Sequence, residues 1–208
     1  MAEFAPTERS RARRRPQRAA YDETSVYAIL DAGILGHVGY SIAGQPFVTP
    51  TAYWREGRKL YWHGAAASRM LEATGAGLPV CLTASHLDGL VVGRSGFAHS
   101  VNYRSVMAFG RARLIEDLND KRAAMDRFID RIYPGRPAVL RPASESELKQ
   151  IALVEMTIEE ASAKVREGGV ADYAPDVGWP AWAGVIPLQT RFGAPEGDGP
   201  GGPPDVAL

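Results

Sequence analysis

The fold is decided by residues 35–64, which read LGHVGYSIAGQPFVTPTAYWREGRKLYWHG. Three runs rich in β-branched and aromatic residues lie in this stretch, at residues 35–42, 47–55 and 59–64. The segments between the runs, Ala43-Gly44-Gln45 and Glu56-Gly57-Arg58, have the length and glycine content of hairpin turns. Residues 35–64 therefore predict three consecutive antiparallel strands.

Further runs of the same character predict more strands around these three. They cover residues 78–85, 89–95, 103–116, 154–158 and 162–166. Helices are predicted after the capping residues Asp22, Ser68 and Ser144, and over an apolar stripe that includes Met125. Six or seven antiparallel strands with a few helices between them predict a mainly β (α+β) fold, a small barrel with peripheral helices. A doubly wound sheet is excluded, because its strands would alternate regularly with helices.

The composition is that of one folded domain. The chain has 208 residues, of which 45% are apolar and 23% charged, so wholesale disorder is excluded. The single cysteine, Cys81, cannot form an internal disulfide, which fits a reducing compartment such as the cytoplasm. The sequence contains no run of ~20 apolar residues and no apolar signal segment, so we expect neither a membrane span nor secretion.

Charge and glycine content divide the chain into three parts. Residues 1–20 form a basic arm, residues 21–192 the barrel domain, and residues 193–208 a tail rich in glycine and proline that we expect to be disordered. Basic and acidic residues balance at 24 each, but residues 9–18 hold six arginines and no acid. No aromatic residues lie between these arginines to stack on bases, so we do not expect nucleic acid as a partner. We expect the arm to pair with the acidic body or with a partner subunit.

The first candidate binding segment is the end of the third strand and the helix start that follows it. A strand ends at His63-Gly64, and Ser68-Arg69 opens a helix four residues later. Free backbone N–H groups, a hydroxyl and a guanidinium together suit a phosphate group. The alternative is that Ser68 only caps the helix and Arg69 only faces solvent, and the spacing leaves both readings open.

The second candidate segment is a polar loop that enters the long strand at residues 103–116. Asn102, Arg104 and Ser105 could hold heteroatoms of a ring or a phosphate, and Tyr103 could cover an aromatic face. The alternative is an ordinary loop whose tyrosine packs on the neighbouring strand. The spacing of the four histidines suits no helical metal site, so we predict no metal site. Phosphate-loop and dinucleotide-binding glycine motifs are also missing.

Weaker candidates lie elsewhere. Pro50 inside a strand pattern predicts an edge or a bulge, where Thr49 and Thr51 could offer main-chain groups to a ligand. Lys164 could reach an anion, although a solvated strand face is the simpler reading. Trp182 is expected to pack at one end of the barrel.

The order of these segments resembles the pyridoxamine 5′-phosphate oxidase-like superfamily of split-barrel flavoproteins, and within it the flavin-nucleotide-binding or nitroimidazole-resistance-like branch. The resemblance runs from about residue 13 to residue 188. The matching motifs are Arg13-Arg14-x-Pro16-x-Arg18-Ala19-x-Tyr21-Asp22, Pro46-x-Val48-x-Pro50, Leu60-Tyr61-x-His63-Gly64, Ala67-Ser68-Arg69-Met70, Asn102-Tyr103-Arg104-Ser105-Val106, Ala163-Lys164-Val165-Arg166 and Trp182-Ala183-Gly184-Val185.

The resemblance implies a six- to seven-stranded split barrel that binds FMN in clefts between the two subunits of a homodimer. The backbone of Val48, Thr49, Pro50 and Thr51 would line the edge of the flavin ring. His63, Gly64, Ser68 and Arg69 would surround the ribityl phosphate. The site would be closed by Asn102, Tyr103, Arg104 and Ser105, with Lys164 or Trp182 from the partner chain.

Two departures from the family pattern limit the implied activity. Met70 stands where pyridoxamine phosphate oxidases carry a phosphate-binding lysine, and residues 189–192 lack their arginine-x-histidine pair for the substrate. The leading hypothesis is therefore an FMN-dependent oxidoreductase acting on a small organic substrate other than pyridoxamine phosphate. The alternatives are a flavin carrier without turnover, a protein that binds haem through His63 or His99, and a reductase that uses the deazaflavin F420.

Overall fold

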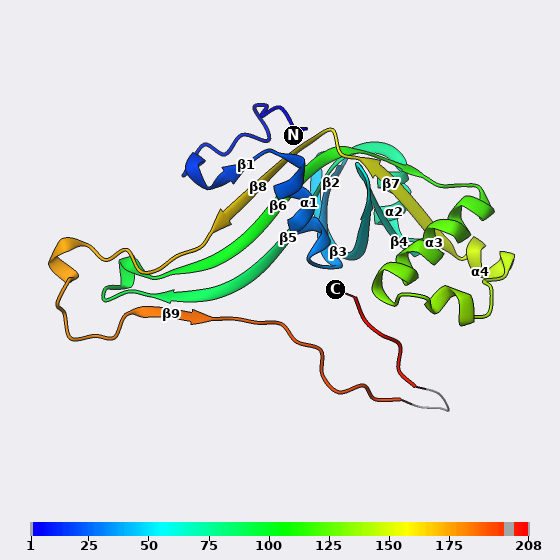
Figure 1. The fold of residues 1–208 in the computed structure, drawn as a ribbon. Helices are drawn as coiled ribbons and strands as arrows, with labels where there is room; N and C mark the ends of the chain where they lie inside the picture. Colours follow the sequence, from blue (N-terminus) through cyan, green and yellow to red (C-terminus); the bar gives the residue numbers. More distant parts are fainter. Residues whose placement is uncertain (1, 198–201, 208) are drawn as a thin grey trace.

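The computed structural model describes residues 2–197 and 202–207 as a barrel with a long strand ribbon leaving it (Figure 1). Residue 1 of the arm lies outside the described residues, and so do residues 198–201 and 208 of the predicted disordered tail. Six antiparallel strands close the barrel in the order β6-β7-β4-β3-β2-β5, and β5 pairs with β6 to complete the ring. The strands are β2 (Leu35–Ile42), β3 (Gln45–Glu56), β4 (Lys59–Ala65), β5 (Ala76–Val92), β6 (Ser100–Leu114) and β7 (Ile151–Thr157). The predicted split barrel is confirmed.

The first two hairpins form because their turns suit the twist of the strands. Ala43 and Gly44 both have positive φ, at 49° and 82°, between the paired residues Ile42 and Gln45. This is the geometry of a type I′ turn, which matches the right-handed twist of the flanking strands. Gly57 has φ 55° in the turn that joins β3 to β4.

One prediction about the strands is wrong. Residues 78–85 and 89–95 were expected to be two strands, but residues 76–92 form the single strand β5. A shift in the β5–β6 register between Leu87 and Gly89 absorbs the irregularity at Asp88-Gly89, so that the pairing with β6 continues. The Asp88 side chain binds Arg104 of β6, and the pair Asp88-Gly89 therefore lies in a bulge and not in a turn.

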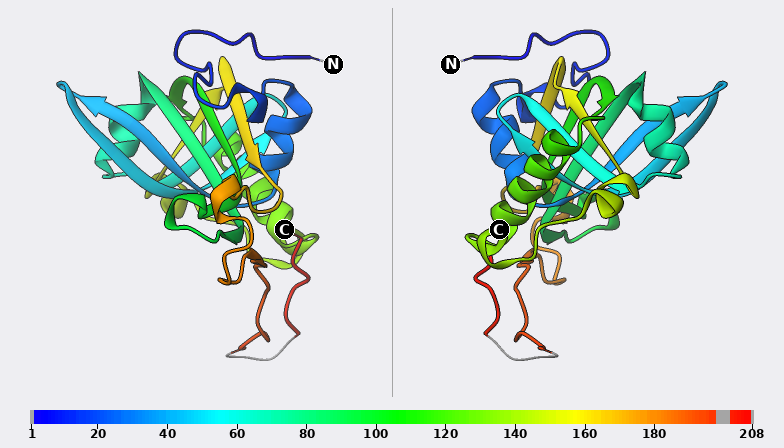
Figure 2. Two further views of the ribbon diagram at one scale, coloured as in Figure 1. Left: turned by 90° about the vertical axis from the view of Figure 1, so that its left-hand side faces the viewer. Right: turned by 90° about the vertical axis from the view of Figure 1, so that its right-hand side faces the viewer.

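The helices begin where their capping residues predict. Asp22 accepts a hydrogen bond from the backbone N–H of Ser25 (2.8 Å) and starts α1 (Glu23–Asp31), whose buried face is Val26, Ile29 and Leu30. α2 (Arg69–Gly75) follows Ser68, and α4 (Glu145–Lys149) carries the predicted capping box. Figure 2 shows α1 and α2 on opposite sides of the strands. Each helix in the described part of the chain is too short or too polar to cross a bilayer.

The longest helix, α3 (Leu118–Ile132), covers part of the outer face of the barrel. The ring of Trp54 stacks on Tyr61 at 5.2 Å between ring centres and on Phe128 of α3 at 4.8 Å. Trp54 is 1% exposed, so this small cluster forms a second core outside the barrel interior. Burial of three aromatic rings fixes α3 against β3 and β4.

The basic arm packs on the barrel. Phe4 is 1% exposed in the main core, and β1 (Ala19–Ala20) pairs with β8 (Glu160–Arg166). Arg9 forms ion pairs with Glu159 and Glu160, as expected for an arm that contacts the acidic body.

The ribbon consists of the far ends of β5 and β6 with one further strand on each edge. β8 pairs with β6, and β9 (Gly184–Pro187) pairs with β5. Figure 1 shows the ribbon extending away from α2 and α3. Several large apolar side chains on its strands are exposed: Leu87, Leu90, Val101, Met107 and Ile186.

Candidate functional site

The N-terminal half of β3 is a free sheet edge. β4 pairs with β3 only over Tyr53–Glu56, so the described residues give Val48, Thr49, Pro50 and Thr51 a single strand neighbour, β2. The Val48 side chain is 69% exposed. Pro50, which lacks an N–H group, fits an edge of this kind. The split in the barrel therefore lies at the segment whose backbone was predicted to meet a ligand.

The end of β4 and the start of α2 lie across this split. Gly64 passes close to α2, because a Cβ atom at this position would lie 3.1 Å from the Leu71 side chain. The Ser68 hydroxyl makes no capping hydrogen bond, and Arg69 forms no ion pair within the described residues. The Arg69 guanidinium lies 4.4 Å from the centre of the Phe47 ring, which holds the cation near the free edge. We call Val48–Thr51, His63, Gly64, Ser68 and Arg69 the split-edge cluster.

The ring of His63 is packed among aromatic side chains. Its ring contacts Phe128 at 5.4 Å and Trp54 at 6.2 Å between ring centres. Burial lowers the pKa of His63 below its ordinary value, because the charged form loses hydration there. Its Nδ1 atom is buried and has no hydrogen-bond partner among the described residues.

The second group of predicted residues lies on the ribbon, and we call Asn102, Tyr103, Arg104, Ser105 and Lys164 the ribbon cluster. Ser105 and Lys164 are cross-strand partners on β6 and β8, and the Ser105 hydroxyl donates to the Lys164 carbonyl (3.3 Å). Asn102 is 9% exposed and donates to the Gly168 carbonyl (3.1 Å).

Arg104 is already engaged by a carboxylate. Its Nε and Nη2 atoms donate to the two oxygens of Asp88 at 3.0 and 2.8 Å. The hydrogen bond to Asp88 raises the pKa of Arg104, and the same bond lowers the pKa of Asp88. Its planar fork closes the bulge in β5, and the ligand-holding role of Arg104 stays a prediction.

The structure does not bring the two clusters together within one chain. β5 begins directly after α2, where Ala76 pairs with Arg113, whereas Asn102 pairs with Gly89 near the other end of the strand. The start of β5 beside α2 and the partner of Asn102 are therefore separated by thirteen residues, roughly 40 Å of strand. Val48–Thr51 lie nearer to the ribbon cluster, because Pro50 and Thr83 of β5 are both cross-strand from His37 of β2. Trp182 lies at the β9 edge of the ribbon, is 63% exposed and packs against Gly184 of its own segment.

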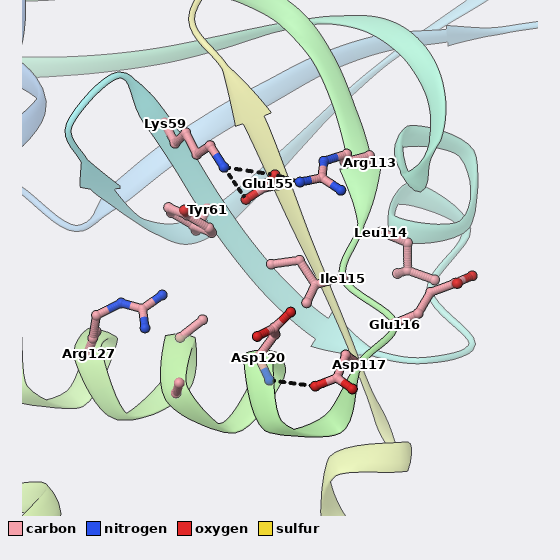
Figure 3. Close-up of a pocket in the computed structure, with 12 residues that line it drawn as sticks. Lys59, Tyr61, Arg113, Leu114, Ile115, Glu116, Asp117, Asp120, Arg127 and Glu155 are labelled. Carbon is pink, nitrogen blue, oxygen red and sulfur yellow. Dashed lines mark hydrogen bonds and ion pairs between the residues drawn. The ribbon is translucent and has the colours of Figure 1, made fainter.

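Figure 3 shows a cavity of about 410 Å³ between α3 and the strands β4, β6 and β7, which sequence reasoning missed. Glu155 lies at its edge, 6% exposed, and accepts from Lys59 through both oxygens at 3.1 Å and from Arg113. A charged residue inside the apolar run Ile151–Thr157 was the available signal. Because both oxygens of Glu155 are already paired, we read this group as structural.

The described residues contain no group of three or more histidine, cysteine, aspartate or glutamate side chains placed to hold a metal ion.

Comparison with known proteins places this geometry in a family. Residues 22–165 match the family described as pyridoxamine 5′-phosphate oxidase. The chain belongs to this family. No curated protein matches the sequence.

Two solved structures resemble this family member over nearly its whole length. The flavocytochrome Anf3 from Azotobacter vinelandii is 45% identical, with 94% of this chain and 91% of that chain covered and a TM-score of 0.88. The FAD and haem binding protein from Mycobacterium smegmatis is 34% identical, with 87% and 89% covered and a TM-score of 0.82. A Bacteroides thetaiotaomicron structure named for 5-nitroimidazole antibiotic resistance shares the fold, at 22% identity and a TM-score of 0.58 over 71% of this chain and 86% of that one.

Proposed function

We propose that this chain is a flavin-binding redox protein that also carries haem. The observation that supports this most strongly is 45% identity over 94% of the chain to a flavocytochrome. A relative that is 34% identical is named for FAD and haem binding. Bound flavin would supply hydride or single-electron transfer, and haem one-electron chemistry.

The split-edge cluster fits the part of a flavin that FMN and FAD share. The free edge of β3 leaves main-chain groups for the polar rim of the ring, and Val48 offers an apolar surface. The Ser68 hydroxyl and the Arg69 guanidinium, neither of which has an acidic partner in the described residues, suit the ribityl phosphate. Met70 is buried in the core at 6% exposure, so the phosphate would be held with one cation fewer than a lysine at this position would give.

A homodimer is part of the proposal. In one chain Ser68 and Arg69 lie beside the opposite end of β5 from Asn102, and the ribbon exposes apolar residues that a second copy would cover. A two-fold arrangement would place the ribbon of each chain at the split edge of the other and form two equivalent sites.

Haem needs a neutral imidazole nitrogen with a free lone pair. The Nδ1 atom of His99 lies 2.9 Å from the Ser95 carbonyl, so the Nδ1–H tautomer would leave Nε2 free in an exposed ring. By contrast, the ring of His63 is packed edge-on against Trp54 and Phe128. We therefore propose that His99 would hold the haem iron.

The histidine assignment is tested by spectra of single variants. His99→Ala should abolish the Soret band and keep the flavin bands, whereas His86→Ala should keep both, because Nε2 of His86 is engaged at 2.9 Å from the Ile29 carbonyl. Loss of the Soret band in His63→Ala, with the band intact in His99→Ala, would assign the ligand to His63.

The cofactor proposal is tested on the freshly purified protein. Its absorbance spectrum should contain flavin bands and a Soret band, and chromatography of the extract should identify the flavin as FMN or FAD. A colourless protein that gains no flavin bands with either compound would refute flavin binding.

Enzymatic turnover of a small organic substrate requires that a nicotinamide nucleotide reduces the flavin and a substrate reoxidises it. Without both steps the carrier function is favoured.

A further inference from the structure

A basic surface that the proposed flavin site leaves unexplained lies where the arm meets the ribbon. Five cations gather there, and we call them the arm–ribbon basic cluster: Arg14, Arg15, Arg18, Lys164 and Arg166. β1 places the arm against β8, with Ala19 paired to Lys164. None of the five forms an ion pair within residues 2–197 and 202–207, whereas Arg9 and Arg13 of the same arm do.

Backbone contacts hold this cluster in place. The Lys164 ammonium donates to the Arg14 carbonyl (3.1 Å), and Arg166 donates to the Asn102 side chain and to the Gly169 carbonyl (3.2 Å). Arg15 has φ 56°, a left-handed conformation that few residues other than glycine adopt. Lys164 and Arg166 are therefore held by neutral oxygen atoms, and none of the five cations has an acidic partner among the described residues.

A cavity of about 430 Å³ opens beside the cluster. Arg18 and Arg166 lie on its walls together with the small apolar residues Ala19, Ala20 and Val165, and the lining also includes Gln17 and the acidic Glu167. This volume lies within the usual range for small-molecule sites, roughly 300–1,000 Å³. Cations beside an apolar wall suit a phosphate joined to a flat aromatic base.

We propose that the arm–ribbon basic cluster binds the adenosine phosphate half of FAD and selects FAD over FMN. This inference rests on the proposed function, and in the dimer the cluster would serve the flavin bound at the split edge of the other copy. FAD differs from FMN by one further phosphate and an adenosine, so selection needs one more cationic site and room for a base. Lys164 joins the cluster to the ribbon cluster through its pairing with Ser105.

A competition experiment on the full-length protein tests the selection. The protein is incubated with equal concentrations of FAD and FMN, freed of unbound flavin and extracted, and the ratio of bound flavins is measured by chromatography. The wild type should hold at least about tenfold more FAD than FMN, which is the scale expected from one or two charged hydrogen bonds. The double variant Arg14→Gln/Arg18→Gln should lose that preference and keep its affinity for FMN.

The chain offers a matched control. Arg11→Gln/Arg13→Gln removes two charges from the same arm at exposed positions outside the cluster, and it should keep the wild-type ratio. Lys164→Met changes the ribbon side of the cluster and should reduce the FAD preference independently of the arm. ADP should displace FAD from the wild type and leave bound FMN in place.

Failure of the inference and failure of the proposed function give different results. A wild type that binds both flavins equally, or a double variant that keeps its FAD preference, would overturn the inference and leave flavin binding standing. The inference is also overturned if Arg14→Gln/Arg18→Gln weakens binding to a DNA oligonucleotide and keeps the preference for FAD, because the cluster would then bind nucleic acid. A wild type that binds neither flavin overturns both.

Discussion

The ion-paired carboxylate at the edge of the cavity in Figure 3 allows a quantitative test of what holds β4, β6 and β7 together. Glu155 on β7 is cross-strand from Tyr61 of β4 and from Arg113 of β6, and it accepts from Lys59 and Arg113. The substitution Glu155→Gln keeps the shape of the side chain and removes its charge. It leaves two cations without their shared anion, and we expect it to destabilise the fold.

The size of the effect follows from the exposure of each group. Removing one partner of a fully buried pair costs about 3–5 kcal/mol. Here the Glu155 side chain is 8% exposed, but the side chains of Lys59 and Arg113 are 41% and 73% exposed and remain hydrated after the substitution. The cost should therefore be smaller, about 1–3 kcal/mol at neutral pH.

The pH dependence gives a second measurement. Burial by itself would raise the pKa of Glu155, but the hydrogen bonds and charges of Lys59 and Arg113 outweigh burial and lower it. A pKa lower in the folded than in the unfolded state means that the unfolded chain binds more protons, so the contribution is present above the unfolded value and is lost as the pH falls through the folded value. The difference between wild type and variant should shrink below about pH 4.

The assay is urea denaturation followed by circular dichroism, for both proteins, at neutral and acidic pH. Glu145→Gln is the control, because Glu145 pairs with Lys149 at 3.4 Å and both side chains are at least 64% exposed. Its cost should stay below about 0.5 kcal/mol. Equal costs for the two substitutions, or a Glu155→Gln cost that does not change with pH, would refute the reasoning.

Three further predictions concern the barrel and the dimer. Gly110→Ala should destabilise the barrel by about 3 kcal/mol or more in the same urea assay, because the added Cβ would lie 2.3 Å from the Thr157 carbonyl oxygen. A cost below about 1 kcal/mol, on the order of a surface change, would contradict the strand packing. Tyr53→Phe should cost about 1–2 kcal/mol, because its buried hydroxyl donates to the Leu30 carbonyl at 2.6 Å; unchanged stability would show that this bond adds nothing. Leu90→Glu, at a ribbon side chain that is 44% exposed, should shift the protein from dimer to monomer in light scattering without unfolding it, and a dimer of unchanged affinity would place the interface elsewhere.

Local signals in the sequence predicted most of the elements. Asp22 and Ser144 begin helices because their side chains accept from backbone N–H groups a few residues on, an interaction contained within one turn. Residues 35–64 form two hairpins because alternation and turn residues act between near neighbours. At Asp88-Gly89 the local signal misled, because a dipeptide typical of turns was accommodated by a bulge opposite β6.

The candidate site was only partly accessible from the sequence. Ser68 and Arg69 are adjacent and could be found by their spacing, and the structure keeps both free of acidic partners in the described residues. The partners of Arg104 and Asn102 could not be found in this way, because each depends on the register between strands that are distant in sequence. The cations of the arm were visible in the sequence, but their position beside Lys164 was not.

The sequence by itself therefore determined the strands, the helix caps, the family motifs and the residue types that suit a flavin phosphate, since these signals extend over a few residues. Only the tertiary structure decided that β5 is a single strand, that the barrel opens between β3 and β4, and that Ser68 and Arg69 lie beside the opposite end of β5 from Asn102. The physical reason is that strand register, bulges and side-chain pairing are settled when distant segments pack together, and packing depends on the whole chain.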